Sequence, residues 1–181
     1  MIVETSPHQM VDCSNVYYRT CRPTDLPFCL QIETASYPPD EAATATSLRY
    51  RQENALTYFL CAVISKTTAS SSVETSSSND PDDIVIGFIC STRCHTFTHD
   101  SMTVHVPDGS ILAIHSVVIA ESYRRQGIAT QMLRHYIQHI VQQQQQPSVT
   151  NDMSETRISK IALLAKAHLL SFYVNCGFQV M

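Results

Sequence analysis

Apolar residues gather along this chain in runs of strand length, separated by polar or periodic segments. Four such runs, rich in β-branched and aromatic residues, cover residues 16–21, 58–64, 84–90 and 110–119. Continuous apolar runs of this length are typical of strands buried in a sheet. We expect a further strand at 158–165 and the start of one more at 178–181.

Helices are expected between these strands. An amphipathic helix over the sheet is predicted by apolar residues at spacings of three and four, namely Ile128, Met132, Leu133, Tyr136, Ile137, Ile140 and Val141. The glutamine tract 142–146 should end it. An earlier helix starts at Thr24 or Asp25 and must break at 37–40, because proline lacks an amide hydrogen. Further helices are predicted at about 41–54 and over 169–176, the last ending at Gly177.

Two segments lack the apolar residues that a packed structure needs. Residues 66–83 are dominated by Ser, Thr, Asp and Asn, which bury too little apolar surface to offset the entropy of ordering. We expect a disordered insertion there and a flexible N-terminus over 1–14. A chain of 181 residues suits one buried core, so residues 15–181 are predicted to form a single α/β domain.

The net charge and the distribution of apolar residues argue against nucleic-acid and membrane partners. A formal net charge of -4 with 15% charged residues gives no broad attraction for nucleic acid. The chain has neither a signal-peptide start nor the run of about 18 apolar residues that a membrane span needs. We therefore expect a monomer in the cytoplasm, with the nucleus left open, and no nucleic-acid or membrane partner.

The cysteines are predicted to be reduced. Their number, seven, is odd, and most lie in segments that read as core. Cys90, Cys94 and His95 lie close in sequence, but this spacing matches no strong zinc pattern and part of it falls within a predicted strand. We expect no bound metal.

The most informative segment joins the strand at 110–119 to the amphipathic helix. It reads Arg124-Arg125-Gln126-Gly127-Ile128-Ala129. A helix N-terminus offers unpaired amide hydrogens and a positive dipole end, and small residues let a phosphate group approach the main chain. The segment lacks the glycine spacing of a nicotinamide-binding turn and the Gly-Lys-Ser/Thr of a Walker loop. It therefore predicts a pyrophosphate site of another kind.

This segment resembles the [RQ]-x-x-G-x-[GA] coenzyme A motif of the GNAT acetyltransferases. Residues 115–129, the Leu170-Ser171-Phe172-Tyr173-x-x-x-Gly177-Phe178 segment and Tyr37-Pro38-Pro39-Asp40-Glu41 are similar to the serotonin (arylalkylamine) and fungal polyamine N-acetyltransferases, over most of 15–180. The resemblance implies a GNAT fold: a mixed, mostly antiparallel sheet with a splayed parallel strand pair and flanking helices, here expected to lack the last strand. It also implies direct transfer of acetyl from acetyl-CoA to the primary amine of a small amine in a ternary complex.

The resemblance also assigns binding residues. Main-chain groups of Val117 and Ile119 would face the pantetheine arm of the coenzyme, and Val118 belongs to the same coenzyme-binding segment. The pyrophosphate would be held by the turn residues Arg124, Arg125, Gln126, Gly127, Ile128, Ala129 and Thr130. Tyr37 and Pro38 would lie in the loop that forms one wall of the amine site.

Two side chains are candidates for proton transfer. An alkylammonium with a pKa of about 10 must lose a proton before it attacks. His115 is the candidate base, because a neutral imidazole titrates at about pH 6.5. The serotonin enzymes carry a second histidine two positions earlier, where this chain has Ala113, so a paired-histidine relay is not expected. Tyr173 is the candidate acid that protonates the departing thiolate. The backbone amide of Val117 is the candidate hydrogen-bond donor to the oxyanion. A strand histidine bonded to a neighbour and a core tyrosine are the structural alternatives.

Two other functions remain open at this stage. The chain could be a coenzyme A-binding module with impaired catalysis, because the expected loss of the last strand would leave the acceptor side incomplete. It could also acetylate protein lysines or N-termini.

Overall fold

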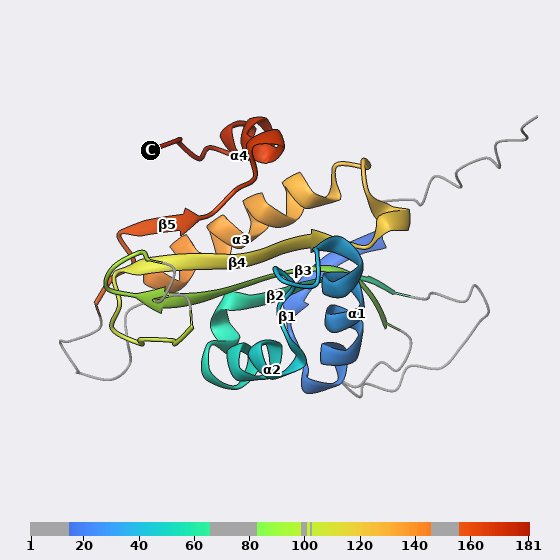
Figure 1. Cartoon of the computed structure of the whole chain (residues 1–181), viewed down its shortest axis with the longest axis horizontal. Helices are drawn as coiled ribbons and strands as arrows, with labels where there is room; N and C mark the ends of the chain where they lie inside the picture. The colour runs from blue at the N-terminus through green and yellow to red at the C-terminus, as the bar shows by residue number, and fades with distance from the viewer. Residues whose placement is uncertain (1–14, 66–82, 99–100, 102, 146–155) are drawn as a thin grey trace, which may run out of the picture.

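The structure is a computed structural model that describes residues 15–65, 83–98, 101, 103–145 and 156–181. Its centre is a five-stranded sheet with the strands in chain order (Figure 1). Pairing is antiparallel from β1 to β4 and parallel between β4 and β5. The strands are β1 (Val16–Thr20), β2 (Phe59–Ser65), β3 (Asp83–Cys94), β4 (Ile111–Ile119) and β5 (Lys160–Leu163).

Helices cover both faces of the sheet (Figure 1). On one face lie α1 (Leu26–Ser36) and α2 (Ala45–Asn54); α3 (Ile128–Gln145) crosses the other, and α4 (Leu170–Asn175) follows β5. Each face has its own apolar core. Met132, Leu133 and Tyr136 of α3 are fully buried on one side, and Cys29 and Leu48 lie in the cluster under α1 and α2. No helix of the described residues is long and apolar enough to cross a membrane.

The predicted strands occur where the apolar runs placed them, with two changes in length. β3 continues to Cys94 because its end pairs with the beginning of β4, Cys94 lying opposite Ile111. β5 is shorter than the predicted 158–165, because its pairing with β4 covers only Lys160–Leu163. The expected strand at 178–181 is wrong: these residues are not in a strand, and the Phe178 amide instead bonds to the carbonyl of Tyr173.

The helices also differ from prediction at their ends. α2 begins at Ala45 rather than near 41, because the carbonyl of Pro38 takes the amides of Glu41 and Ala42 in a turn and Thr44 caps the helix. α3 runs through Gln145, so most of the glutamine tract is helical. The expectations for 1–14 and 66–82 lie outside the described residues, and Asp83, placed in the insertion, belongs to β3.

Two irregularities in β4 matter for the site. The register with β3 shifts between Cys90, opposite Ser116, and Ser91, opposite Ile114, so His115 has no partner residue in the ladder. Such a bulge turns consecutive side chains toward one face. On the other edge, pairing with β5 stops at Ile114, and residues 115–119 continue without a parallel neighbour in the part of the chain that the structure describes. We call this unpaired edge of 115–119 the open side of β4; it corresponds to the splay that the resemblance implied.

Candidate active site

The turn between β4 and α3 leaves helix amides available. Gly127 has φ 79°, in the left-handed region that suits a residue without Cβ. The first intrahelical bond runs from the Gln131 amide to the Gly127 carbonyl. Among the described residues, no hydrogen bond uses the amides of Ile128, Ala129 or Thr130. Three donors at the positive end of an 18-residue helix therefore point at one place, which suits an anion.

The two arginines of the turn differ in their contacts. Arg124 donates from Nε to the Ile119 carbonyl at 2.9 Å and from Nη2 to Ser36 Oγ at 2.9 Å, which ties the turn to β4 and α1. Arg125 is exposed, with φ 63°, and makes no hydrogen bond or ion pair within the described part of the chain. Arg124 thus has a bracing contact that the sequence did not reveal, whereas Arg125 keeps its charge available.

We expect Arg125→Gly to weaken coenzyme A binding without destabilising the fold. The charge-assisted contact that we expect Arg125 to make with the pyrophosphate would be worth about 1.5–3 kcal/mol, or about tenfold or more in Kd. Relief of the left-handed strain and the added chain entropy of glycine are each about 1 kcal/mol and oppose one another. Calorimetry and thermal melting measure the two effects. Arg49→Ala, exposed on α2, is the charge-matched control, and equal affinities in the two variants would contradict the assignment.

Main-chain groups on the open side of β4 are oriented by the antiparallel ladder. The Ala120 amide bonds to the Ile86 carbonyl, and Phe88 lies opposite Val118. Bonded pairs alternate along such a ladder, so the main-chain groups of Val118 face β3 and those of Val117 and Ile119 face away. The Ile119 carbonyl is taken by Arg124, which leaves the groups of Val117 turned toward the open side.

Tyr37 is affected electrostatically by groups from distant parts of the chain, among them Tyr173 and the main chain of Val117. Tyr37 is the C-cap residue that follows α1. Burial raises its pKa, Glu33 and Tyr173 add to the rise, and a hydrogen bond with the backbone of Val117 opposes it. These groups are therefore electrostatic neighbours although they lie far apart in sequence. Glu41 and Lys166 form an ion pair of 2.8 Å that joins the α1–α2 loop to the segment before α4. Pro38 of this loop is exposed, and its part in the site stays a prediction.

The Tyr173 phenol is held by aromatic packing. Its ring meets the edges of Phe172 and Phe178, at centroid distances of 4.9 and 5.8 Å, and the residue is 8% exposed. Burial, and then Cys176, raises the pKa of Tyr173, so the hydroxyl keeps its proton at neutral pH. A protonated phenol is what donation to a thiolate requires.

His115 lies on the face covered by α1 and α2. Its Nε2 is 2.7 Å from Thr92 Oγ1. Burial, and then the charge of Arg51, lowers the pKa of His115 to about 3. The predicted titration near pH 6.5 is therefore wrong: the imidazole is neutral at cellular pH, as expected, but it is a much weaker base than the sequence suggested.

Glu33 is a residue of this region that the sequence analysis missed. Its carboxylate lies in α1 at 2% exposure, and Oε1 accepts the Ala43 amide at 2.9 Å and the Ser116 hydroxyl at 3.0 Å. Oε2 is buried without a partner in the described residues. Burial raises the pKa of Glu33, against the opposing effects of Ala43, Ser116 and Arg51. The only signal in the sequence was its spacing, four residues after Cys29 and four before Tyr37 on a core-facing helix.

The model of the Acetyltransferase (GNAT) family matches residues 27–178 of the chain. The chain belongs to this family. Membership of the GNAT family confirms the predicted fold class and the predicted class of enzyme, an N-acetyltransferase. No curated protein sequence matches the chain.

Solved structures resemble this GNAT chain at low identity. A predicted acetyltransferase with acetyl-CoA from Clostridium acetobutylicum has 18% identity and a TM-score of 0.53, over 92% of this chain and 91% of that one. Glucosamine-6-phosphate N-acetyltransferase from Arabidopsis thaliana has 12% identity and a TM-score of 0.53, over 92% of both chains. The GphF GNAT-like decarboxylase in complex with isobutyryl-CoA has 14% identity and a TM-score of 0.52. The match covers 68% of this chain and 58% of the decarboxylase chain. These likenesses show the fold alone.

Proposed function

We propose that this GNAT enzyme moves acetyl from acetyl-CoA to the primary amine of a small amine, a polyamine or an arylalkylamine. The observation that carries the proposal is the open side of β4 at 115–119, an edge that β5 leaves unpaired and near which Tyr173 and the Val117 backbone affect the pKa of Tyr37. The free helix amides at Ile128, Ala129 and Thr130 follow the same strand. A thioester bound between the open side of β4 and these helix amides would lie beside a proton donor, Tyr173, and an amide donor, Val117.

Coenzyme binding is assigned to the turn and the open strand edge. The amides of 128–130 and the Arg125 side chain would bind the pyrophosphate, with Gln126 and Gly127 shaping the turn. Val117 and Ile119 would face the pantetheine arm, and Val118 would hold β4 against β3. Acetyl-CoA in the Clostridium acetobutylicum structure supports this cosubstrate for the shared fold.

Proton transfer from the amine is assigned to Glu33. Its raised pKa makes it a stronger base than an ordinary carboxylate, and its unpartnered Oε2 has room for one further hydrogen bond. The Ser116 hydroxyl already donates to Oε1 and lies next to Val117 in β4, so it can relay a proton between the acetyl site and Glu33. His115 remains the alternative base, and it requires its pKa to rise when ligands bind.

After deprotonation, the amine nitrogen attacks the thioester carbonyl. The Val117 amide would stabilise the oxyanion, and Tyr173 would give its proton to the leaving sulfur. The protons balance over the cycle. The first ammonium proton goes to Glu33 before attack, and Glu33 later releases it to solvent. The phenol proton goes to the thiolate, and the second nitrogen proton, lost as the intermediate collapses to the amide, restores the phenol. Tyr37 and the neighbouring Pro38 would line the acceptor side.

His115→Gln separates the two candidate bases. If Glu33 is the base, the dependence of rate on pH above about pH 6 stays unchanged in the variant. Stability responds differently, because a folded pKa of about 3 contributes stability that is present above the unfolded value of 6.5 and is lost as pH falls toward 3. The variant should therefore melt with less sensitivity to acid in this window. Loss of a rate limb near neutral pH would identify His115 as the base instead.

An acceptor panel tests the function directly. Calorimetry should first detect one coenzyme A bound per chain; free thiol release from acetyl-CoA should then follow addition of spermidine, tryptamine or phenylethylamine. Binding without turnover by any amine would indicate a coenzyme A-binding module. Turnover by a lysine peptide alone would indicate a protein acetyltransferase. We also propose that the protein is a cytoplasmic monomer.

A further inference from the structure

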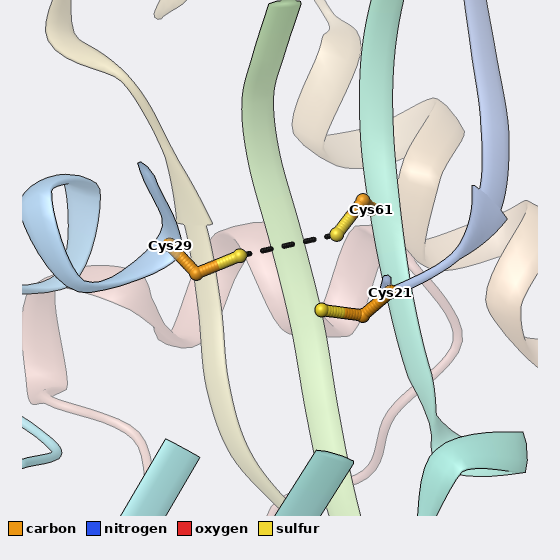
Figure 2. Close-up of side chains that lie close together, drawn as sticks. All are labelled: Cys21, Cys29 and Cys61. Carbon is orange, nitrogen blue, oxygen red and sulfur yellow. Dashed lines mark hydrogen bonds between the residues drawn. The ribbon is translucent and has the colours of Figure 1, made fainter. Parts of the chain in front are cut away.

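Three cysteine side chains from three elements meet in the core under α1 and α2. Cys21 follows β1, Cys29 lies in α1 and Cys61 lies in β2, and Figure 2 shows their sulfur atoms directed toward one another. The sulfur atoms all lie within 4.8 Å of one another, and those of Cys29 and Cys61 are 3.9 Å apart. The three residues are 2%, 0% and 0% exposed.

We propose that this cysteine cluster binds one thiophilic cation with a filled d shell, Cu(I) or Zn(II), through its three sulfur atoms. Metal–sulfur bonds of about 2.3 Å place two sulfur ligands of one ion about 3.8–4.0 Å apart in tetrahedral or trigonal geometry. The measured 3.9 Å separation fits this range without movement of α1 relative to β2. Sulfur ligands select these soft cations over calcium or magnesium.

A disulfide fits the cluster less well than a metal ion. The sulfur atoms of Cys29 and Cys61 would have to close from 3.9 Å to about 2.05 Å, and the Cys21 thiol would be left over. Within the described residues, no histidine or carboxylate joins the group, so the ligand set is sulfur alone. This set accounts for three cysteines that neither the coenzyme nor the acceptor uses.

A fixed cation beside the cluster offsets part of the cost of burying thiolates. The guanidinium of Arg19 interacts electrostatically with Cys61 and Cys21. It is held by hydrogen bonds of 2.6 and 3.0 Å to the carboxylate of Asp25, which cancels some of this effect. The positive ion itself supplies the rest of the compensation, because thiolates ionise as they bind it.

Binding of the ion would connect α1 to two strands. Cys29 lies four residues before Glu33 on the same face of α1, so an ion held by Cys29, Cys21 and Cys61 fixes the helix that carries Glu33. A link of this kind is made only in the folded state, so the ion stabilises the fold.

The test uses the full chain refolded under reducing conditions with Cu(I) or Zn(II), because the buried sulfur atoms are accessible only before the core closes. Metal content per chain, sulfur-to-metal charge transfer in the ultraviolet and the number of sulfur ligands from X-ray absorption are measured. We expect one ion per chain, three sulfur ligands and a raised melting temperature. Binding of either cation in this way supports the site, and the two arms identify which one it prefers.

Matched cysteine variants decide the location. Cys29→Ala and Cys61→Ala should weaken binding by about 100-fold or more, because even partners outside the ligand set change affinity 10- to 100-fold. Cys94→Ala removes an equally buried thiol elsewhere and should bind as the wild type does. Wild-type chain that refolds without taking up metal, or equal metal content in Cys29→Ala and Cys94→Ala, would overturn the proposal. Metal content per folded chain keeps the comparison valid if a variant melts lower.

Discussion

Glu33→Gln is expected to lower kcat/KM for amine acetylation by about 100-fold or more, the range typical of a lost general base. The glutamine carbonyl can still accept the Ala43 amide and the Ser116 hydroxyl, so the fold keeps its contacts. The rising limb that wild-type kcat/KM shows with pH should flatten in the variant. Steady-state kinetics across pH measures both effects.

The same variant should change stability in the opposite direction. The folded-state pKa of Glu33 is raised, so its contribution to stability is present at low pH and is lost as pH rises through that pKa. Above it, a buried charge destabilises the wild type and not the variant, which should melt at an equal or higher temperature. Glu53→Gln, exposed near the end of α2, is the control. Wild-type kinetics in Glu33→Gln would remove Glu33 from the mechanism.

Tyr173→Phe is expected to lower kcat by about 100-fold while the Kd for coenzyme A stays unchanged. The ring keeps its packing against Phe172 and Phe178, and only the proton donor is lost. Single-turnover acetyl transfer and calorimetry measure the two quantities separately. A fall in coenzyme affinity with kcat preserved would show that the phenol binds the cosubstrate instead.

Tyr136→Phe is the matched control for this experiment. The Tyr136 hydroxyl bonds to Ser91 at 2.7 Å, on the other side of the sheet from Glu33. Its loss should cost about 1 kcal/mol of stability, the ordinary value of a buried hydrogen bond, and should leave kcat near wild type. The pair therefore separates a catalytic phenol from a structural one.

Local patterns predicted most of the fold. The apolar runs located all five strands, and the three- and four-residue spacing located α3, because burial of a face is encoded in adjacent residues. The ends of elements were less predictable, since β3 is lengthened and β5 shortened by partners far away in sequence. The expected strand at 178–181 failed for the same reason, because a strand needs a neighbour to pair with.

The candidate site shows the same difference between features set by local sequence and features set by distant residues. Gly127 and the helix start were readable because the turn is local, although the positive φ of Gly127 was not predicted. Glu33 could not be found in this way, since the hydrogen bond of its carboxylate depends on α1 lying against Ser116, next to the bulge at His115. The low pKa of His115 likewise follows from burial beside Arg51, which no local pattern contains.

The open side of β4 presents peptide groups rather than side chains. Any residue that replaces Val117 and keeps the backbone extended offers the same amide and carbonyl in the same positions. A ligand bound here would therefore be selected by the spacing of its own amide groups. Exchange of valine for isoleucine at this position should therefore leave the affinity for such a ligand nearly unchanged. Specificity that depends on strand geometry can persist when sequences diverge widely. Comparisons of side chains alone do not detect it.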